Sequence, residues 1–138
     1  MRFNIIAFSL LILMSLLGCD EEFDEDNYVS FPLEITLMDK SYTTIGYICS
    51  DGSIKDRHFD IVGHIYSNGR VTDCHYDNVG SVVKQTESTY IILDRHYDEQ
   101  GYVYIANGEV RNSHYDIVGY GSGDNIWKAG ALLLLSIQ

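Results

Sequence analysis

The chain has 138 residues and a formal net charge of −11, and 46% of its residues are hydrophobic. This length is sufficient for one domain with its own core. Binding to phosphate groups depends on clustered lysine and arginine, whereas the sequence has 9 such residues against 20 acids and no basic patch. We therefore do not expect nucleic acid or an anionic lipid surface as a partner.

Residues 1–18 have the pattern of a bacterial secretory signal peptide. One cation, Arg2, precedes an apolar stretch at residues 5–17. The stretch is shorter than the roughly 20 residues that span a membrane, which disfavours a transmembrane anchor. The segment Leu16-Leu17-Gly18-Cys19 resembles the lipobox of bacterial lipoproteins. This resemblance implies cleavage before Cys19, lipidation of its sulfur with fatty acids such as palmitate, and anchoring to a membrane through that lipid.

Residues 19–27 are expected to form a disordered tether. Six of the seven residues at 20–26 are acidic and none is basic, and such a run repels itself and buries too little apolar surface to fold. The run also resembles the acidic export signal of certain Gram-negative surface lipoproteins, which implies an outer-membrane lipoprotein exposed at the cell surface. The alternative is a solvating spacer on a lipoprotein that faces the periplasm.

Residues 28–138 form one repeat domain in this interpretation, because one short motif occurs five times. Each copy has an aliphatic residue, then an acid or amide two positions later, usually followed by a histidine, an aromatic residue and an aspartate. Successive copies are 17, 17, 21 and 18 residues apart, which indicates one small unit arrayed until the copies cover each other's apolar faces. The acid or amide positions are Asp39, Asp56, Asp73, Asp94 and Asn112.

A glycine follows at a fixed distance in every copy, five residues after the histidine position. Glycine is required either where φ is positive or where strands crowd too closely for a Cβ atom. We expect that short hairpins, each marginal alone, gain stability by meeting at these glycines. The glycines are Gly46, Gly63, Gly80, Gly101 and Gly119.

The composition favours strands, and no window shows helical apolar spacing. The dipeptides Asp51-Gly52, Asn68-Gly69 and Asn107-Gly108 indicate hairpins with type I′ turns, which need positive φ at both central residues. The predicted strand pairs are 45–49 with 53–56, 62–66 with 70–73, and 102–106 with 109–112, with a longer tip at 84–89 and a last hairpin at 120–127. Core side chains are expected four residues before and seven residues after the histidine position.

The two ends of the domain are predicted to close the array. Residues 33–37 and 131–137 could pair as strands and remove the exposed edges, which gives five or six petals. The run at 131–135 is too apolar for an exposed position and should be buried. The predicted fold class is therefore all-β: about five short hairpin repeats around an approximate symmetry axis.

With its repeated aliphatic-x-Asp-x-x-aromatic-x-x-Val-Gly unit and its Asp-Gly and Asn-Gly tips, the chain resembles the β-flower proteins over residues 33–135. These are small bacterial repeat proteins with four- or five-fold symmetry. The resemblance implies short hairpins that radiate around an axis, and it implies no established activity.

The corner histidines are candidate metal ligands, because neutral imidazole binds zinc, copper and nickel. The competing interpretation is structural: each acid caps backbone amides in the turn, and each histidine satisfies a neighbouring carbonyl group. We favour the structural role and assign no metal or cofactor. His64, outside the motif, is expected to be an exposed strand residue. The candidate ligands are His58, His75, His96 and His114.

We predict no enzymatic activity. Histidine with aspartate can transfer protons, but an active site needs different groups in different roles at one place, and these copies are alike. An extracellular hydrolase is the remote alternative. The cysteines beyond Cys19 are Cys49 and Cys74, and nothing in the repeat brings these two together for a disulfide.

The 11 tyrosines are the remaining signal. Those at the corners are expected to wedge between neighbouring repeats, whereas the strand tyrosines and Trp127 could bind a glycan or a protein. The leading hypothesis is a non-catalytic, surface-tethered binding or scaffolding module, and the alternative is a metal-binding lipoprotein. The strand set is Tyr47, Tyr66, Tyr90, Tyr102, Tyr104 and Tyr120, with Tyr28 at the domain entrance.

Overall fold

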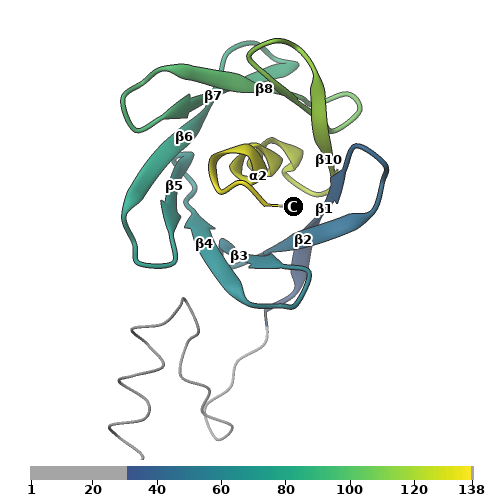
Figure 1. Ribbon diagram of the computed structural model, residues 1–138, viewed down its shortest axis with the longest axis vertical. Helices are drawn as coiled ribbons and strands as arrows, with labels where there is room; N and C mark the ends of the chain where they lie inside the picture. The colour runs from purple at the N-terminus through teal and green to yellow at the C-terminus, as the bar shows by residue number, and fades with distance from the viewer. Residues whose placement is uncertain (1–30, 138) are drawn as a thin grey trace, which may run out of the picture. The chain divides into compact units, whose positions relative to one another are not determined.

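The computed structural model describes residues 31–137, and these form one ring of ten antiparallel strands (Figure 1). The all-β class and the repeated hairpins predicted from the sequence are confirmed. The strands are β1 (Leu33–Asp39), β2 (Thr44–Cys49), β3 (Ser53–Asp56), β4 (Ile61–Ile65), β5 (Arg70–Asp73), β6 (Asn78–Lys84), β7 (Thr89–Asp94), β8 (Glu99–Tyr104), β9 (Glu109–Asn112) and β10 (Ile117–Gly123).

Every strand pairs with its neighbours in sequence, and β1 pairs with β10 to close the barrel. The closing pair runs in register from Ile35 opposite Gly123 to Asp39 opposite Gly119. Our prediction that residues 33–37 would pair with residues 131–137 is wrong, because β10 takes that place. A sixth petal is therefore not formed.

The turns alternate between the two ends of the barrel. At one end lie the five motif corners, which connect β1 to β2, β3 to β4, β5 to β6, β7 to β8 and β9 to β10. At the other end lie the tips of the predicted hairpins, and their pairings, including the enlarged β6–β7 hairpin, are confirmed. The predicted last hairpin at 120–127 is wrong, because β10 ends at Gly123 and a helical turn follows.

The tip turns differ from the predicted type I′ geometry. Positive φ occurs at the glycines alone, with values of 89° at Gly52 and Gly69 and 72° at Gly108. The aspartate or asparagine before each glycine has another function: its side-chain oxygen accepts the amide N–H two residues ahead, as Asn68 Oδ1 does from Arg70 at 3.0 Å. These residues are therefore selected as side-chain acceptors, which the Asp-Gly and Asn-Gly pattern alone did not distinguish.

The C-terminal segment is helical and lies inside the ring (Figure 1). A 3₁₀ helix, η2 (Ile126–Gly130), continues into α2 (Ala131–Leu134). The prediction that the run at 131–135 is buried is confirmed in part: Ala131 and Leu132 are 0% and 4% exposed, whereas Leu133, Leu134 and Leu135 are partly buried. The predictions of a strand here and of no helix in the chain are wrong. Successive residues of this segment contact different repeats of the ring, so its apolar residues follow one another and show no amphipathic period.

The repeat glycines contact this segment. Our prediction that they meet one another is wrong. A Cβ atom at Gly63 would lie 2.4 Å from the Thr72 carbonyl oxygen and 2.8 Å from Leu135 Cδ1. Crowding therefore explains the glycines, and among these five only Gly80, at 151°, has positive φ. The segment meets the five repeats one residue at a time. The contacts are Leu132 with Gly119, Leu133 with Gly101, Leu134 with Gly80, Leu135 with Gly63 and Ile137 with Gly46.

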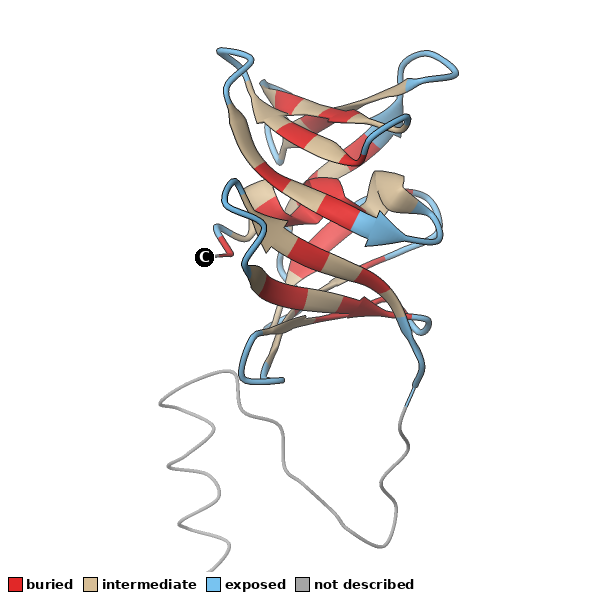
Figure 2. Cartoon of the chain, turned by 90° about the vertical axis from the view of Figure 1, so that its right-hand side faces the viewer, coloured by how far each residue is buried: buried red, intermediate tan, exposed pale blue. Residues whose placement is uncertain are grey.

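The core lies between the strands and the C-terminal segment. Buried and partly buried positions alternate along the strands, whereas the turns at both ends are exposed (Figure 2). The predicted aliphatic positions, two in each of the first four repeats and one in the fifth, are all buried, so this prediction is confirmed. They are Leu37, Ile54, Val71, Ile92 and Val110 in one set and Ile48, Ile65, Val82 and Val103 in the other.

Candidate functional site: the corner aromatics and an asymmetric groove

The five corners share one hydrogen-bonded turn. In the third copy, Asp73 Oδ1 accepts the amide N–H of His75 at 2.8 Å and that of Asp77 at 3.0 Å. The backbone closes around it, because Tyr76 N–H donates to the Asp73 carbonyl and Asp73 N–H donates to that of Asp77. The other four copies repeat both side-chain contacts. The predicted capping role of the corner acids is therefore confirmed.

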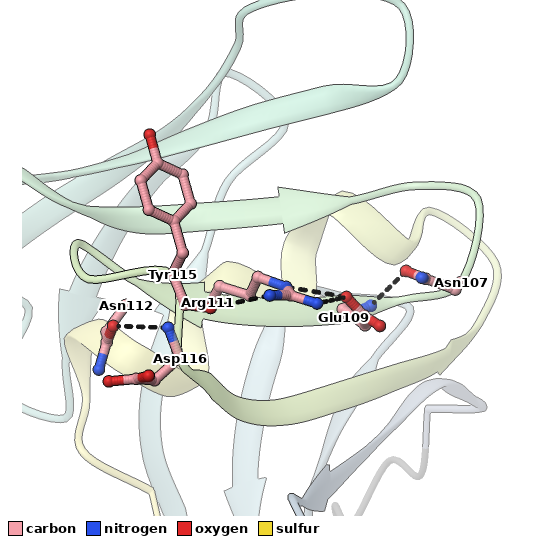
Figure 3. Close-up of polar contacts among 6 residues, drawn as sticks. All are labelled: Asn107, Glu109, Arg111, Asn112, Tyr115 and Asp116. Atoms are coloured by element: carbon pink, nitrogen blue, oxygen red, sulfur yellow. Dashed lines mark hydrogen bonds and ion pairs between the residues drawn. The ribbon is translucent and has the colours of Figure 1, made fainter.

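The fifth corner shows how an asparagine performs the same function (Figure 3). Asn112 Oδ1 accepts the amides of His114 at 2.9 Å and Asp116 at 3.1 Å. Arg111 pairs with Glu109 at 2.8 Å and donates to the Tyr115 carbonyl at 2.8 Å. The Tyr115 ring points away from these polar groups. Because an amide oxygen and a carboxylate oxygen serve equally here, the turn needs an acceptor and not a charge.

All five corner aromatics have left-handed backbone conformation. The φ angles of Tyr42, Phe59, Tyr76, Tyr97 and Tyr115 are 65° or 66°. The β4–β5 tip has the same two backbone hydrogen bonds, and there the equivalent residue is Gly69. Left-handed φ costs an ordinary L-residue roughly 1–2 kcal/mol. The chain therefore keeps a bulky ring at a position where glycine would avoid this conformational free-energy cost.

Four of these rings stack on the residue that follows a repeat glycine on the neighbouring strand. Tyr97 is the exception, since the equivalent neighbour is Ser81 and no ring of the described chain stacks on it. Tyr97 is accordingly 80% exposed, the most of the five. The centroid distances are 4.4 Å for Tyr42 with Tyr120, 4.8 Å for Phe59 with Tyr47, 4.8 Å for Tyr76 with His64 and 5.3 Å for Tyr115 with Tyr102.

Two phenols in these stacks are shifted toward the neutral form. The hydrogen bond of Tyr102 to the Glu99 carboxylate, at 2.8 Å, raises the pKa of Tyr102 above its ordinary value, and Tyr115 adds to the effect. Hydrogen bonding with Tyr42 raises the pKa of Tyr120. Both phenols therefore stay protonated to a higher pH than an ordinary tyrosine does.

The histidines do not converge. His58, His75, His96 and His114 are exposed and lie on four different corners. Within residues 31–137 there is no group of three His, Cys, Asp or Glu side chains that could hold a metal ion. The predicted contact of each histidine with a carbonyl group has no support at His96, whose Nε2 accepts from Arg95 Nε at 3.3 Å.

His64 differs from the prediction of an exposed residue. Its ring is half-buried under Tyr76, and its Nδ1 atom is buried without a hydrogen-bond partner. The reason is its place after Gly63, which is the position that receives a corner ring. Cys49 is buried as a free thiol, so Cys49 and Cys74 are not joined to each other.

A groove lies at the tip end of the barrel, where the repeat is irregular. It has a volume of about 330 Å³ and is lined by the end of β6, the β8–β9 tip and the connection from β10 to η2. Tyr90 and Trp127 stack there with centroids 5.5 Å apart and an interplanar angle of 12°. The sequence named both rings as a possible binding face, but it did not indicate the polar rim of Lys84, Glu87, Asp124 and Asn125.

The predicted signal peptide, the lipidation site Cys19, the tether and Tyr28 lie outside the described residues. In the part of the chain that the structure describes, no helix has both the length and the apolar character needed to cross a membrane.

The comparison with protein families decides between the four-fold and five-fold forms. The family model described as "5-fold beta-flower protein" matches residues 33–133, which cover all ten strands of the ring and part of the C-terminal segment. The chain belongs to the 5-fold β-flower family. In this β-flower protein, the five repeats are the five corner hairpins. Tip turns connect four neighbouring pairs of these hairpins, whereas the fifth pair is joined only by the pairing of β10 with β1. No curated protein and no solved structure matches the chain.

Proposed function

We propose that this β-flower protein is a non-catalytic binding or scaffolding module, anchored by lipid at Cys19 in the outer membrane and exposed at the cell surface. Its partner is a glycan or a protein. The observation that carries the binding role is Tyr97, an 80% exposed ring held at a φ of 66° without a stacking partner in the described chain.

The conformational cost at Tyr97 supports an external partner. At the other corners, stacking offsets left-handed strain, since an aromatic pair contributes about 0.5–1.5 kcal/mol beyond its burial. Tyr97 has no stacking interaction within the described chain to offset its strain, although glycine forms the same turn at Gly69. Strained residues that the fold does not need are typical of functional sites, and exposed tyrosine is enriched at binding hot spots.

The similarity of the copies supports a non-catalytic role. Each corner presents its side chains singly and at a different place around the ring, whereas catalysis needs unlike groups together. The same separation makes the histidines a weaker basis for function than the aromatic rings. Zinc titration with elemental analysis tests this: we expect no tight binding, and tight binding lost in both His75→Ala and His96→Ala would replace our proposal with a metal-binding one.

Site-specific photocrosslinking in living cells tests the binding role. A photoreactive phenylalanine replaces Tyr97 in one variant and Ser67, on the exposed β4–β5 tip, in a control variant. We expect discrete adducts from position 97 and none from position 67. The same substitution is made at the four other corner aromatics. If none of the five positions yields an adduct, the corner end of the barrel is not a binding surface.

The anchoring part of the proposal rests on the sequence of residues 16–26. Radiolabelled palmitate should label the wild-type protein and not the Cys19→Ser variant. Changing the six acids at 20–26 to their amides should reduce protease digestion of the protein on intact cells. If digestion is unchanged by these substitutions, the acidic run is a spacer. If the wild-type protein is also protected from protease on intact cells, it faces the periplasm.

A further inference from the structure

The five-fold repeat is interrupted on one side of the tip end, and the groove lies at that interruption. The β6–β7 hairpin has a longer tip, with Gln85–Ser88 between its strands, and the chain leaves the ring after β10 through Asp124 and Asn125. The β8–β9 tip lies between these two irregular features in the order of the ring. Groups that occur once in the molecule therefore gather here, as a specific binding site requires.

Tyr90 forms one wall of the groove by a change at a repeat position. It lies two residues before the buried Ile92, and the equivalent residues in three other repeats are the turn glycines. The pairing agrees: Val82 N–H donates to the Gly69 carbonyl, and Tyr90 lies opposite Val103. A phenol ring thus stands where those repeats carry only hydrogen. The equivalent glycines are Gly52, Gly69 and Gly108.

The neighbours of Trp127 in sequence hold it against Tyr90. Lys128 Nζ binds Glu34 Oε1 at 2.7 Å, and both side chains are only 13% exposed. Asn125 Nδ2 donates to the same oxygen at 3.1 Å. Glu34 belongs to β1, so the segment that carries Trp127 is tied to the closing strand of the barrel. The aromatic wall is therefore formed before a ligand arrives, which lowers the entropy cost of binding.

The rim provides hydrogen-bond donors and acceptors with little net charge. On one side Lys84 pairs with Glu87 at 3.1 Å, and both are largely exposed. On the other side lie Asp124 and Asn125. One cation and two acids disfavour an anionic ligand, and the Lys84 ammonium group disfavours a cation. The groove volume of about 330 Å³ is near the lower limit of roughly 300 Å³ for ligand sites.

We infer that this groove binds a neutral saccharide of one or two rings. The C–H face of a pyranose lies on the Tyr90–Trp127 wall, and its hydroxyl groups bind the carboxylate and amide groups of the rim. Aromatic walls with a few placed polar groups suit a ligand that has both an apolar face and hydroxyl groups. The inference rests on the proposed binding role and names a site and ligand class for it.

The chain offers a direct reporter, because Trp127 is its only tryptophan. Cellobiose, maltose, lactose and N,N′-diacetylchitobiose are titrated into the full-length protein in detergent while tryptophan emission is recorded. With each sugar at about 10 mM, even a dissociation constant of about 1 mM gives near saturation. We expect a saturable change with at least one sugar and none with tetramethylammonium or heparin.

Three variants locate the response. Asp124→Ala and Tyr90→Gly, which restores the residue of the other repeats, should each weaken binding about tenfold or more. Ser67→Ala, on the exposed β4–β5 tip and outside the groove lining, should leave it unchanged. Thermal unfolding checks that each variant is folded, and calorimetry on Asp124→Ala confirms the result without a fluorescent reporter.

The outcomes separate this inference from the proposed function. If none of the sugars gives a saturable change, or if tetramethylammonium or heparin alone does, the saccharide site is overturned. Adducts at position 97 would then still support a binding module. If a sugar binds equally well to Asp124→Ala and Tyr90→Gly, the saccharide lies elsewhere and the groove is not its site.

Discussion

Leu135 lies against Gly63, at a distance where a Cβ atom on the glycine would meet Leu135 Cδ1 at 2.8 Å. The two residues come from the C-terminal segment and from β4, and they bring the end of the chain against the second repeat. Four similar contacts distribute the segment over the other repeats. The stability of the ring is therefore coupled to that of the segment inside it.

The first prediction concerns this contact. Gly63→Ala should lower the free energy of unfolding by about 1–3 kcal/mol, as overpacking of a filled interior does. Adding Leu135→Ala removes one of the two clashes and leaves the Thr72 carbonyl oxygen at 2.4 Å. The double variant should thus be more stable than the sum of the single changes predicts, in urea denaturation of all four proteins. Strict additivity would show that the residues do not contact.

The second prediction tests the C-terminal segment as the centre of the core. Leu132→Ala should cost about 2–5 kcal/mol, because Leu132 is 4% exposed and its removal leaves a cavity. Ser122→Ala, at an exposed position of β10, is the matched control and should have no effect. Thermal unfolding followed by circular dichroism measures both. An unchanged midpoint for Leu132→Ala would mean that the barrel does not depend on this segment.

The third prediction concerns the acceptor at the corners. Asp73→Ala should cost about 1–2 kcal/mol, because two backbone amides lose their acceptor. Asp73→Asn should be nearly neutral, since Asn112 performs this function in the fifth copy. Asp77→Ala, an exposed corner aspartate, is the control. If Asp73→Asn is as damaging as Asp73→Ala, the charge and not the acceptor is required.

A fourth prediction compares two corner rings. In Tyr97→Gly, relief of strain of about 1–2 kcal/mol is set against about 0.4–1 kcal/mol of chain entropy, so stability should be unchanged or slightly higher. Phe59→Gly also loses its stack with Tyr47 and should be lower than Tyr97→Gly by about 1 kcal/mol. Equal effects in chemical denaturation would remove the argument that Tyr97 lacks a structural role.

The fifth prediction separates two ion pairs. Lys128→Ala leaves Glu34, which is 13% exposed, without its counterion, and should cost up to about 3 kcal/mol. Lys84→Ala breaks a pair whose side chains are 52% and 94% exposed and should cost at most about 1 kcal/mol. Denaturant unfolding of both variants checks the order. The reverse order would mean that the Glu34 pair does not hold β1 to η2.

The repeat was predictable because the corner motif and the strand pairings depend on neighbours in sequence. The position of Val71 between two polar residues and the tips at Gly52 and Gly69 are local signals of this kind. The core positions and the acceptor role of Asp73 also follow from the repeat, because each copy has the same local requirement. The five-fold class could be approached from the motif, although the number of petals was left open.

The C-terminal segment could not be predicted in this way. Leu132, Leu133 and Leu134 face three different repeats, so the sequence shows a plain apolar run that is equally compatible with a buried strand. The groove has a related explanation. Tyr90 is visible in the sequence as a departure from the turn glycine, but its stack on Trp127 depends on where η2 turns inside the ring.

The one-to-one contact between the C-terminal segment and the repeat glycines also limits how this protein can change by duplication or deletion. The segment meets Gly119, Gly101, Gly80, Gly63 and Gly46 in reverse chain order. One residue inserted within it would displace every later leucine to a wrong partner, whereas the β6–β7 tip accommodates extra residues. A gained repeat would have a glycine without a contact residue in the segment, and a lost repeat would leave one residue of the segment without its glycine. The C-terminal segment thus restricts the number of repeats to five.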